Sequence, residues 1–336
     1  MAVCSGARAG IGAAGGTCRK VLEYMADGDS AEGLVIRAQS GFYFVRAGDE
    51  TVTCTLPGRF KQGRRTVKNP VVVGDRVVFR RLLDVDGVIE RVNPRRNELA
   101  RTAAGDTGMK QVLAANLDLV VLAVALREPS LNRARLDRFL LATEQSGITP
   151  VILVTKLDLG TQEEAETALQ PYRDIGYHVV LSSTKTGEGL DQLRALLTGR
   201  ISTIIGASGV GKSTILNALQ PGLKLKEGAV SASTGKGRHT TTVADLIALD
   251  FGGYLADTPG LRELAPWDLS IEELPGLFPE MRPYLDACRF SRCTHLHEPG
   301  CAVRRALEEG LIDAERYHTY VKMRTEDLKE PPRGGR

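Results

Sequence analysis

The sequence predicts a multi-domain α/β protein that contains a small β-barrel, a parallel sheet with helices on both faces, and a helical metal-binding module. Three observations predict this organisation: short apolar runs separated by turn residues, then apolar runs that alternate with helical patterns, and finally a cluster of cysteine and histidine near the C-terminus. We expect four segments, namely a disordered leader, the barrel, the α/β domain and the metal-binding module with its basic tail, at 1–30, 31–103, 111–263 and 264–336.

Composition excludes several classes of protein. Of the 336 residues, 42% are hydrophobic and 25% are charged, and no apolar run approaches the roughly 18 residues that a membrane-spanning helix needs. Six cysteines in so long a chain do not form the dense framework of a disulfide-rich secreted domain. We therefore expect a reducing compartment, the cytoplasm, and free thiols at Cys4, Cys18 and Cys54.

The first 22 residues carry three basic side chains and no acidic one. The small residues between Gly10 and Gly16 are unlike the apolar core of a signal peptide. The segment is therefore a disordered leader, a weak transit segment, or a stretch upstream of the true start at Met25. We favour the first and the last of these interpretations.

Short strand-like runs dominate the region before residue 100. Separated by glycines and charged pairs, they lie at 34–37, 42–45, 51–56, 71–73, 76–79 and 87–92. This spacing predicts a five-stranded barrel of the OB type, with a ligand-free β-sandwich as the alternative. Between Arg59 and Arg101, twelve Lys and Arg stand against five Asp and Glu. The barrel is therefore a candidate for contact with a polyanion, although scattered solvated arginines would give the same excess.

Strands alternate with helices after residue 110. Buried strands are expected at 117–126, 151–154, 179–181 and 201–205. The helices that follow the first three are expected at 131–147, 163–175 and 190–197. This alternation is typical of a parallel sheet whose right-handed crossovers place helices on both faces.

A phosphate-binding loop follows the strand at 201–205. The segment Gly206-Ala207-Ser208-Gly209-Val210-Gly211-Lys212-Ser213-Thr214 fits the pattern G-x-x-x-x-G-K-[ST], with a strand before it and a helical run after it. Backbone N–H groups and the helix N-terminus would surround the phosphates, Lys212 would add a full positive charge, and the Ser213 hydroxyl would bind Mg²⁺. A glycine-rich turn that matches by accident is the alternative, and the surrounding elements argue against it.

Two further motifs stand at the ends of consecutive strands. Thr155-Lys156-Leu157-Asp158 follows one strand, where ligands bind in open α/β sheets, and Ser183-Thr184-Lys185 follows the next. The Asp158 carboxylate can accept hydrogen bonds from both the ring N–H and the exocyclic amine of guanine, a pair that adenine does not offer. The first motif resembles the [NT]-K-x-D signature of the translation-factor-related GTPases, and the second is similar to their S-A-K element. Because Thr155 stands where Asn is usual, one supporting hydrogen bond is expected to differ.

The order of these motifs differs from that of ordinary GTPases, in which the phosphate loop comes first. Here positions 155 and 183 precede 206, so the sequence predicts a circularly permuted GTPase domain. The stretch 222–242, rich in Gly, Ser and Lys, is expected to become ordered around the nucleotide, with Thr241 binding Mg²⁺ as the γ-phosphate sensor. A disordered loop without a ligand is the alternative.

Asp257-Thr258-Pro259-Gly260 completes the expected site. The resemblance implies that Asp257 holds Mg²⁺ through water and that the Gly260 N–H contacts the γ-phosphate. Leu261 stands near the place where other GTPases supply a water-positioning glutamine, so intrinsic hydrolysis should be slow. His239 or a docked partner is our hypothesis for the group that orients the water, although a lone histidine is more often just a loop residue. The predicted catalytic set is His239, Thr241, Asp257 and Gly260.

A metal site is expected near the C-terminus. Three thiolates and one imidazole, a closed tetrahedral set that suits structural zinc and leaves no open position for catalysis, come from Cys288, Cys293, His295 and Cys301. His297 is the alternative to His295. The stretch 303–322 is predicted to be helical.

The barrel, the permuted GTPase motifs and the C-x4-C-x-H-x5-C cluster together resemble those of the RsgA family, also called YjeQ or EngC, over about residues 30–325. The resemblance implies GTP hydrolysis stimulated by the small ribosomal subunit during its late maturation, with Mg²⁺ and one structural Zn²⁺. It also implies that the barrel and the metal module bind ribosomal RNA and protein. We expect a monomer without membrane contact.

Two alternatives to this interpretation remain. One is a GTPase that acts on another RNA or on the large ribosomal subunit, and the other is a zinc-dependent RNA-binding protein with a structural nucleotide. A consequence of the permutation is that 257–260 leads directly into the metal module. We therefore expect the γ-phosphate to change how that module sits against RNA.

Overall fold

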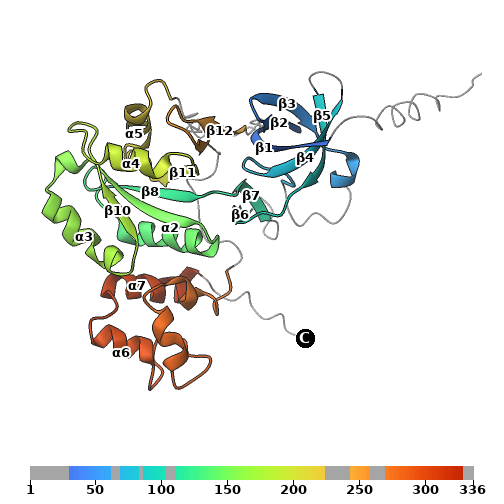
Figure 1. Cartoon of the computed structure of the whole chain (residues 1–336). Coiled ribbons are helices and arrows are strands. Elements are labelled where there is room, and N and C mark those ends of the chain that lie inside the picture. Colours follow the sequence, from blue (N-terminus) through green and yellow to red (C-terminus); the bar gives the residue numbers. More distant parts are fainter. Residues whose placement is uncertain are drawn as a thin grey trace, which may run out of the picture.

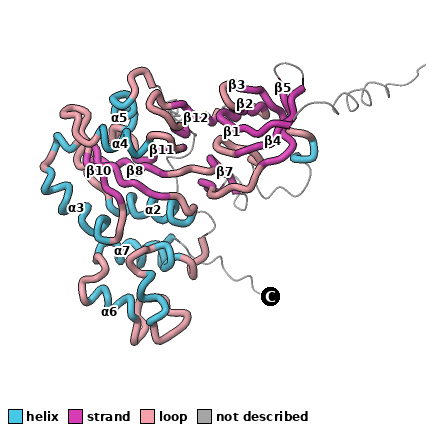
Figure 2. The backbone as a smooth tube through the Cα atoms, viewed as in Figure 1, coloured by secondary structure: helices cyan, strands magenta, loops and turns pink. Residues whose placement is uncertain are grey.

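The computed structural model describes residues 30–61, 69–82, 86–102, 110–223, 243–257 and 269–327. Figure 1 shows a β-barrel formed by the N-terminal strands, an α/β domain in the middle, and a small helical module near the C-terminus. Strands dominate the first part and helices the last, whereas the middle part contains both (Figure 2). No described helix is long and apolar enough to cross a membrane. Nearly all of the expected leader and the basic tail lie outside the described residues.

Five strands form the barrel: β1 Ser30–Gln39, β2 Phe42–Ala47, β3 Glu50–Thr55, β4 Arg76–Leu82 and β5 Asp86–Val92, with a 3-10 turn at Gly58–Lys61. Their order is β1-β2-β3-β5-β4, and β1 also pairs with β4, which closes the sheet. Inward-facing side chains such as Val35, Phe79 and Ile89 are fully buried in its core. The predicted five-stranded OB-type barrel is confirmed.

The α/β domain is built on six strands: β8 Leu119–Ala125, β9 Thr149–Thr155, β10 His178–Leu181, β11 Ile201–Gly206, β12 Ala244–Ala248 and β13 Tyr254–Asp257. They lie in the order β10-β9-β8-β11-β13-β12, all parallel except β12, which runs antiparallel to β13. Every residue of β8 is buried, as expected for a central strand that is covered on both faces.

Helices cover both faces of this sheet: α2 Arg133–Gln145 and α3 Gln162–Asp174 on one, α4 Leu190–Leu197 and α5 Lys212–Leu219 on the other. A 3-10 turn, Leu157–Leu159, precedes α3. The two faces follow from the alternation of side chains along a strand: in β8, Leu122 packs with Leu140 of α2, whereas Val121 packs in the core that contains Leu193 of α4. The predicted parallel sheet with helices on both faces is confirmed.

A two-stranded hairpin, β6 Glu98–Thr102 and β7 Lys110–Ala115, lies between the barrel and the α/β domain (Figure 1). Arg95 donates hydrogen bonds to both carboxylate oxygens of the fully buried Asp75, at 2.7 and 2.9 Å, and to Glu98 at 2.7 Å. Such a charge-assisted, bidentate pair is both strong and directional. It therefore holds the barrel wall against the hairpin.

The barrel is also joined to the edge of the α/β sheet. β1 pairs antiparallel with β12, with Arg37 opposite Asp245 and Ala38 opposite Ala244. The Arg37 guanidinium forms an ion pair with the Asp245 carboxylate, at 2.7 Å, across this strand pair. As a result, the barrel strands and the α/β strands form one continuous hydrogen-bonded sheet.

The C-terminal module contains two 3-10 helices, two α-helices and a final π-helical turn: η4 Leu274–Leu277, η5 Arg282–Ala287, α6 Ala302–Glu308, α7 Ala314–Lys322 and η6 Met323–Asp327. The predicted helix over 303–322 is therefore two helices. Gly310 adopts a φ of 72°, the left-handed conformation that ends helices, and Asp313 then caps α7 by accepting from the Arg316 N–H.

A buried arginine fastens this module to the α/β domain. The Arg316 side chain of α7 is only 1% exposed and donates to Asp137 of α2 at 2.6 Å and to both carboxylate oxygens of Glu280, at 2.5 and 3.1 Å. Its guanidinium also lies 5.3 Å from the ring centroid of Tyr172 in α3. Helices α2, α3 and α7 therefore meet at one cation.

Replacing Arg316 with Met should destabilise the protein by about 3–5 kcal/mol, because Asp137 and Glu280 would stay buried without their cationic partner. Chemical unfolding followed by circular dichroism measures this change. Arg304→Met removes a partly exposed arginine of α6 and is the matched control, with an expected effect below about 1 kcal/mol. Equal effects of the two substitutions would contradict the role assigned to Arg316.

Candidate functional site

The predicted phosphate loop connects the end of β11 to the start of α5. Gly206 lies so close to β8 that a Cβ there would approach the Ala123 carbonyl oxygen to 2.3 Å, and Gly209 and Gly211 adopt φ of 79° and 94°. Side chains other than hydrogen fit none of these three positions without strain. The glycines therefore allow the sharp turn that leads into the N-terminus of α5.

Lys212 and Ser213 occupy the first turn of α5. The Lys212 ammonium lies across the loop and donates to the carbonyl oxygens of Gly206 at 2.8 Å and Ala207 at 2.7 Å. Ser213 and Thr214 are exposed beside it. A cation and two hydroxyl groups thus stand at the end of a helix whose own dipole favours anions.

The Thr155–Asp158 motif and the Ser183–Lys185 motif lie next to each other at the ends of β9 and β10. The Asp158 carboxylate accepts a hydrogen bond from the Ser183 hydroxyl at 2.7 Å and pairs with the Lys185 ammonium at 2.7 Å. The hydrogen bond from Lys185, followed by that from Ser183, lowers the pKa of the Asp158 carboxyl below its usual value. Asp158 is therefore an anion that can accept hydrogen bonds at neutral pH.

These motifs and the phosphate loop surround one cavity of about 230 Å³. Its walls include Thr155, Lys156, Asp158, Thr184, Lys185, Gly211 and Thr214. The structure thus brings together residues that the sequence separates by more than fifty positions, at the strand ends where a ligand of an open α/β sheet is expected.

The Thr155 hydroxyl stands at the first position of the [NT]-K-x-D motif, where one supporting hydrogen bond was expected to differ from that of an Asn. It lies within hydrogen-bond distance of two carbonyl oxygens, that of Val124 at 3.2 Å and that of Val210 in the phosphate loop. Because a hydroxyl has one proton, Thr155 donates to one of these carbonyls at a time and so links the end of β9 either to the neighbouring strand or to the loop. The supporting contact is made by an O–H donor rather than by an amide.

One wall of the cavity was not predicted from the sequence. Glu128, just after β8, lines the cavity, and its carbonyl oxygen accepts a hydrogen bond from the Lys156 ammonium. The position of Glu128 beyond the carboxyl end of a parallel strand was the available signal, since ligands bind at such ends. No motif pattern covers the residue.

Among the predicted catalytic residues, the structure describes Asp257 alone. Asp257 ends β13, the strand next to β11, so it shares a sheet edge with the start of the phosphate loop. His239, Thr241 and Gly260 lie outside the described residues.

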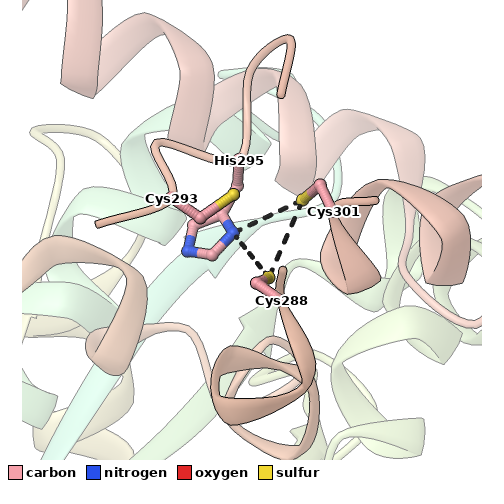
Figure 3. Close-up of side chains that lie close together, drawn as sticks. All are labelled: Cys288, Cys293, His295 and Cys301. Carbon is pink, nitrogen blue, oxygen red and sulfur yellow. Dashed lines mark hydrogen bonds between the residues drawn. The ribbon is translucent and has the colours of Figure 1, made fainter. Parts of the chain in front are cut away.

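Three cysteines and one histidine form a second site, in the C-terminal module (Figure 3). The ligand atoms of Cys288, Cys293, His295 and Cys301 all lie within 4.8 Å of one another. The His295 Nδ1 is 3.5 Å from the sulfurs of both Cys288 and Cys301, and these two sulfurs are 4.0 Å apart. A tetrahedral zinc with its usual bond lengths would separate its ligands by about 3.5–3.8 Å, so the cluster has the size of a metal site.

Hydrogen bonds hold the loop that carries these ligands. The Glu298 carboxylate accepts from the backbone N–H groups of Thr294, Leu296 and His297 at 2.7–3.2 Å. Burial opposes ionisation of Glu298, but these bonds prevail and hold its pKa below the usual range. His297, the alternative ligand, is outside the cluster and exposed. Cys54 is a buried free thiol, whereas Cys4 and Cys18 lie outside the described residues.

A phosphate loop that follows two strand-end motifs in the chain, yet meets them at one edge of a parallel sheet, defines the class: this is a circularly permuted P-loop GTPase. The sequence matches the family profile described as RsgA GTPase over residues 92–267 and that described as RsgA N-terminal domain over residues 32–89. The chain therefore belongs to the RsgA GTPase family.

Similar proteins support this assignment over nearly the whole chain. The protein named small ribosomal subunit biogenesis GTPase RsgA from Moorella thermoacetica is 44% identical, over 86% of this chain and 95% of that protein. The protein of the same name from Geobacillus thermodenitrificans is 41% identical, over 90% and 99%. Among solved structures, YjeQ from Thermotoga maritima matches with a TM-score of 0.73 at 35% identity, over 90% of this chain and 100% of that chain. YloQ, described as a circularly permuted GTPase, matches with a TM-score of 0.70 at 35% identity, over 90% and 97%.

Thr155→Val should weaken the affinity for guanine nucleotides about 5-fold, because the loss of one hydrogen bond is worth about 1 kcal/mol and frees the phosphate loop from β9. Isothermal titration calorimetry with GDP measures the change. Thr155→Ser keeps the hydroxyl and should keep the affinity. A serine variant that binds as weakly as the valine variant would show that the methyl group, and not the hydrogen bond, matters at this position.

Proposed function

We propose that this protein hydrolyses GTP to GDP and phosphate on the small ribosomal subunit during late maturation of that subunit. The observation that carries the proposal is the single cavity that joins the phosphate loop to the guanine-reading motifs, in a chain whose relatives are named small ribosomal subunit biogenesis GTPases. GTP hydrolysis follows from membership of the family. The ribosomal partner is the part that needs an experiment.

The residues at the two ends of the cavity have different roles in this proposal. Asp158 accepts from the two in-plane N–H donors of guanine, with Ser183 and Lys185 holding its carboxylate in place. The stem of Lys156 lies along the base. The glycine-rich loop surrounds the phosphates, and Lys212 neutralises part of their charge.

Mg²⁺ would be held by oxygen donors at the phosphate end of the cavity. Ser213, on the exposed first turn of α5, and Thr241 are the proposed direct ligands, with Asp257 acting through water. Hydroxyl and carboxylate oxygens are the donors that this hard cation prefers. Mg²⁺ supplies charge stabilisation for phosphoryl transfer, and Gly260 contributes a backbone N–H to the γ-phosphate. His239 or a docked partner orients the attacking water, because Leu261 carries no polar group.

The metal of the C-terminal module is proposed to be zinc. Three thiolates and one imidazole are soft donors, and four of them leave no open coordination position. The ion therefore has a structural role, since it would tie η5 to the start of α6 through Cys288 and Cys301.

We infer that the protein acts as a cytoplasmic monomer, with domains at 31–103, 111–263 and 264–336 after a leader at 1–30, which lies almost wholly outside the described residues. The ribosomal RNA and proteins of the small subunit are its proposed partners. The name of its relatives, small ribosomal subunit biogenesis GTPase, supports the proposed partner.

Purified small ribosomal subunits should raise the turnover rate for GTP by roughly 10-fold or more, because a docked partner can supply or order the group that positions water. Multiple-turnover assays with small subunits, large subunits and no addition measure the effect. Stimulation by large subunits alone would reject the proposed partner.

Two variants test the nucleotide site in the same assay. Lys212→Ala should abolish hydrolysis, since the phosphates lose their cation. Asp158→Asn should reduce the preference for GTP over ATP, because an amide donates where the carboxylate accepts. Unchanged preference in the Asp158 variant would show that guanine is read elsewhere.

The purified protein should contain one zinc per chain, and Cys301→Ser should lose it together with the stability of the C-terminal module, because structural zinc contributes about 10 kcal/mol or more to folding. Elemental analysis by mass spectrometry and thermal unfolding with and without a chelator measure both effects. Cys54→Ser is the control, because Cys54 is buried in the barrel core and away from the cluster. A Cys54 variant that loses zinc, or a Cys301 variant that keeps it, would contradict this assignment.

A further inference from the structure

Glu128, one wall of the nucleotide cavity, has no role in the function proposed above. It follows β8 and lines the cavity together with Lys156, Asp158 and Lys185. The Glu128 side chain is exposed. Within the part of the chain that the structure describes, its carboxylate takes part in neither an ion pair nor a hydrogen bond. Glu128 therefore brings an uncommitted acceptor to the edge of the cavity.

The residues on either side determine where Glu128 lies. Arg127 forms an ion pair at 2.7 Å with Glu164, in the first turn of α3. On the other side, Pro129 lies beside the phosphate loop, since a Cβ built on Gly209 would come within 4.0 Å of the proline ring. The segment is therefore attached both to a helix of the α/β domain and to the loop that follows β11.

The backbone of Glu128 has an unusual conformation. Its φ of 54° lies in the left-handed region, which glycine, asparagine and aspartate adopt far more readily than glutamate does. Such a conformation costs free energy and persists where surrounding contacts hold it, often at ligand sites. Here the Glu128 carbonyl oxygen accepts a hydrogen bond from the Lys156 ammonium, and Lys156 itself has a φ of 55°. Two residues in this conformation are therefore joined across the cavity.

Glu128 lies between the two ends of the cavity. At the base end, the pKa of Lys185 is raised above its usual value, mainly by the hydrogen bond to Asp158, and the Glu128 carboxylate adds a smaller contribution. This carboxylate is therefore within electrostatic reach of the Lys185 ammonium. At the phosphate end, the adjacent Pro129 approaches Gly209. Because the ribose joins the base to the phosphates, a nucleotide bound at both ends would place its ribose beside Glu128.

The donors of a guanine nucleotide limit what this carboxylate can bind. An ionised carboxylate only accepts hydrogen bonds, and the phosphate oxygens are anionic acceptors that would repel it. On the base, the ring N–H and the exocyclic amine belong to the edge that Asp158 is proposed to read. The remaining donors are the two ribose hydroxyl groups. Acidic residues bind ribose hydroxyls in the same way in dinucleotide-binding α/β folds.

We propose that Glu128 is a specificity-determining residue whose carboxylate accepts hydrogen bonds from the ribose hydroxyl groups of the bound guanine nucleotide. The protein then selects ribonucleotides through Glu128, as it selects guanine through Asp158. Lys156 supports both functions, because its ammonium holds the Glu128 main chain while its stem lies along the base. The proposal rests on the proposed nucleotide site, but not on the ribosomal partner.

The test compares two ligands that differ only in the ribose hydroxyls. Isothermal titration calorimetry with the full-length protein measures the affinities for GDP and for 2′,3′-dideoxy-GDP. The wild type should bind GDP about 10-fold more tightly, as expected for a hydrogen bond to a charged group. Glu128→Ala should reduce this preference to about 2-fold or less, because no acceptor remains at the side chain. Glu128→Gln keeps a neutral acceptor oxygen and should give an intermediate preference of about 3-fold.

Glu188→Ala is the matched control. It removes the same charge from an exposed site after β10, outside the cavity walls, and should keep the wild-type preference. A Glu188 variant that loses the preference as fully as the Glu128 variant would overturn the proposal, since a general effect of charge would then explain both results.

The remaining outcomes separate this proposal from the proposed function. Wild-type protein that binds both ligands equally would overturn the role of Glu128 and leave the guanine site in place. An alanine variant that loses affinity for both ligands by the same factor would also overturn it, because Glu128 would then act only by holding the segment. Wild-type protein that binds neither ligand would overturn this proposal together with the proposed nucleotide site.

Discussion

The constraint on which this structure depends is that parallel strands bring their carboxyl ends to a single edge of the sheet. β9, β10, β11 and β13 end at that edge, and each is followed by one of the motifs that surround or flank the cavity. Their order along the chain does not matter, because the position of a strand in the sheet, and not its place in the sequence, decides what its end contacts. Permutation therefore preserves the site and changes only which segment follows each motif along the chain.

Two modules are attached to the α/β domain, each by a different kind of contact. The barrel joins the sheet edge through the β1–β12 ladder and the hairpin through Arg95, whereas the C-terminal module docks on helices through the buried Arg316. Arg316 resists movement of the module, since separating it from Asp137 and Glu280 would leave charges buried without partners. The expected effect of the γ-phosphate on this module therefore has to overcome that contact, or act within the part of the module that lies away from it.

Local patterns in the sequence were sufficient for the strand-end motifs, the barrel and the metal cluster, because glycine spacing, residue alternation and ligand spacing are short-range features. Such patterns do not predict contacts between residues that lie far apart in the sequence. Arg316 looks like a surface residue in a one-dimensional sequence, since arginine is rarely buried, and its partners lie 36 and 179 positions away. The helix break at Gly310 was missed because the apolar pattern continues across it on both sides.

The junction between barrel and sheet also bears on the electrostatics of the nucleotide site. In the sheet, Arg37 of β1 is opposite Asp245 of β12, and Asp245 is opposite Asp257 of β13. Directly opposed residues project on the same face, so the two carboxylates repel each other. The Arg37 guanidinium, at 2.7 Å from Asp245, offsets part of this repulsion. The barrel thus contributes a charge to β12, the strand beside the one that carries the proposed Mg²⁺-binding Asp257. Its attachment to the sheet edge is therefore part of the electrostatic environment of the site as well as of the architecture.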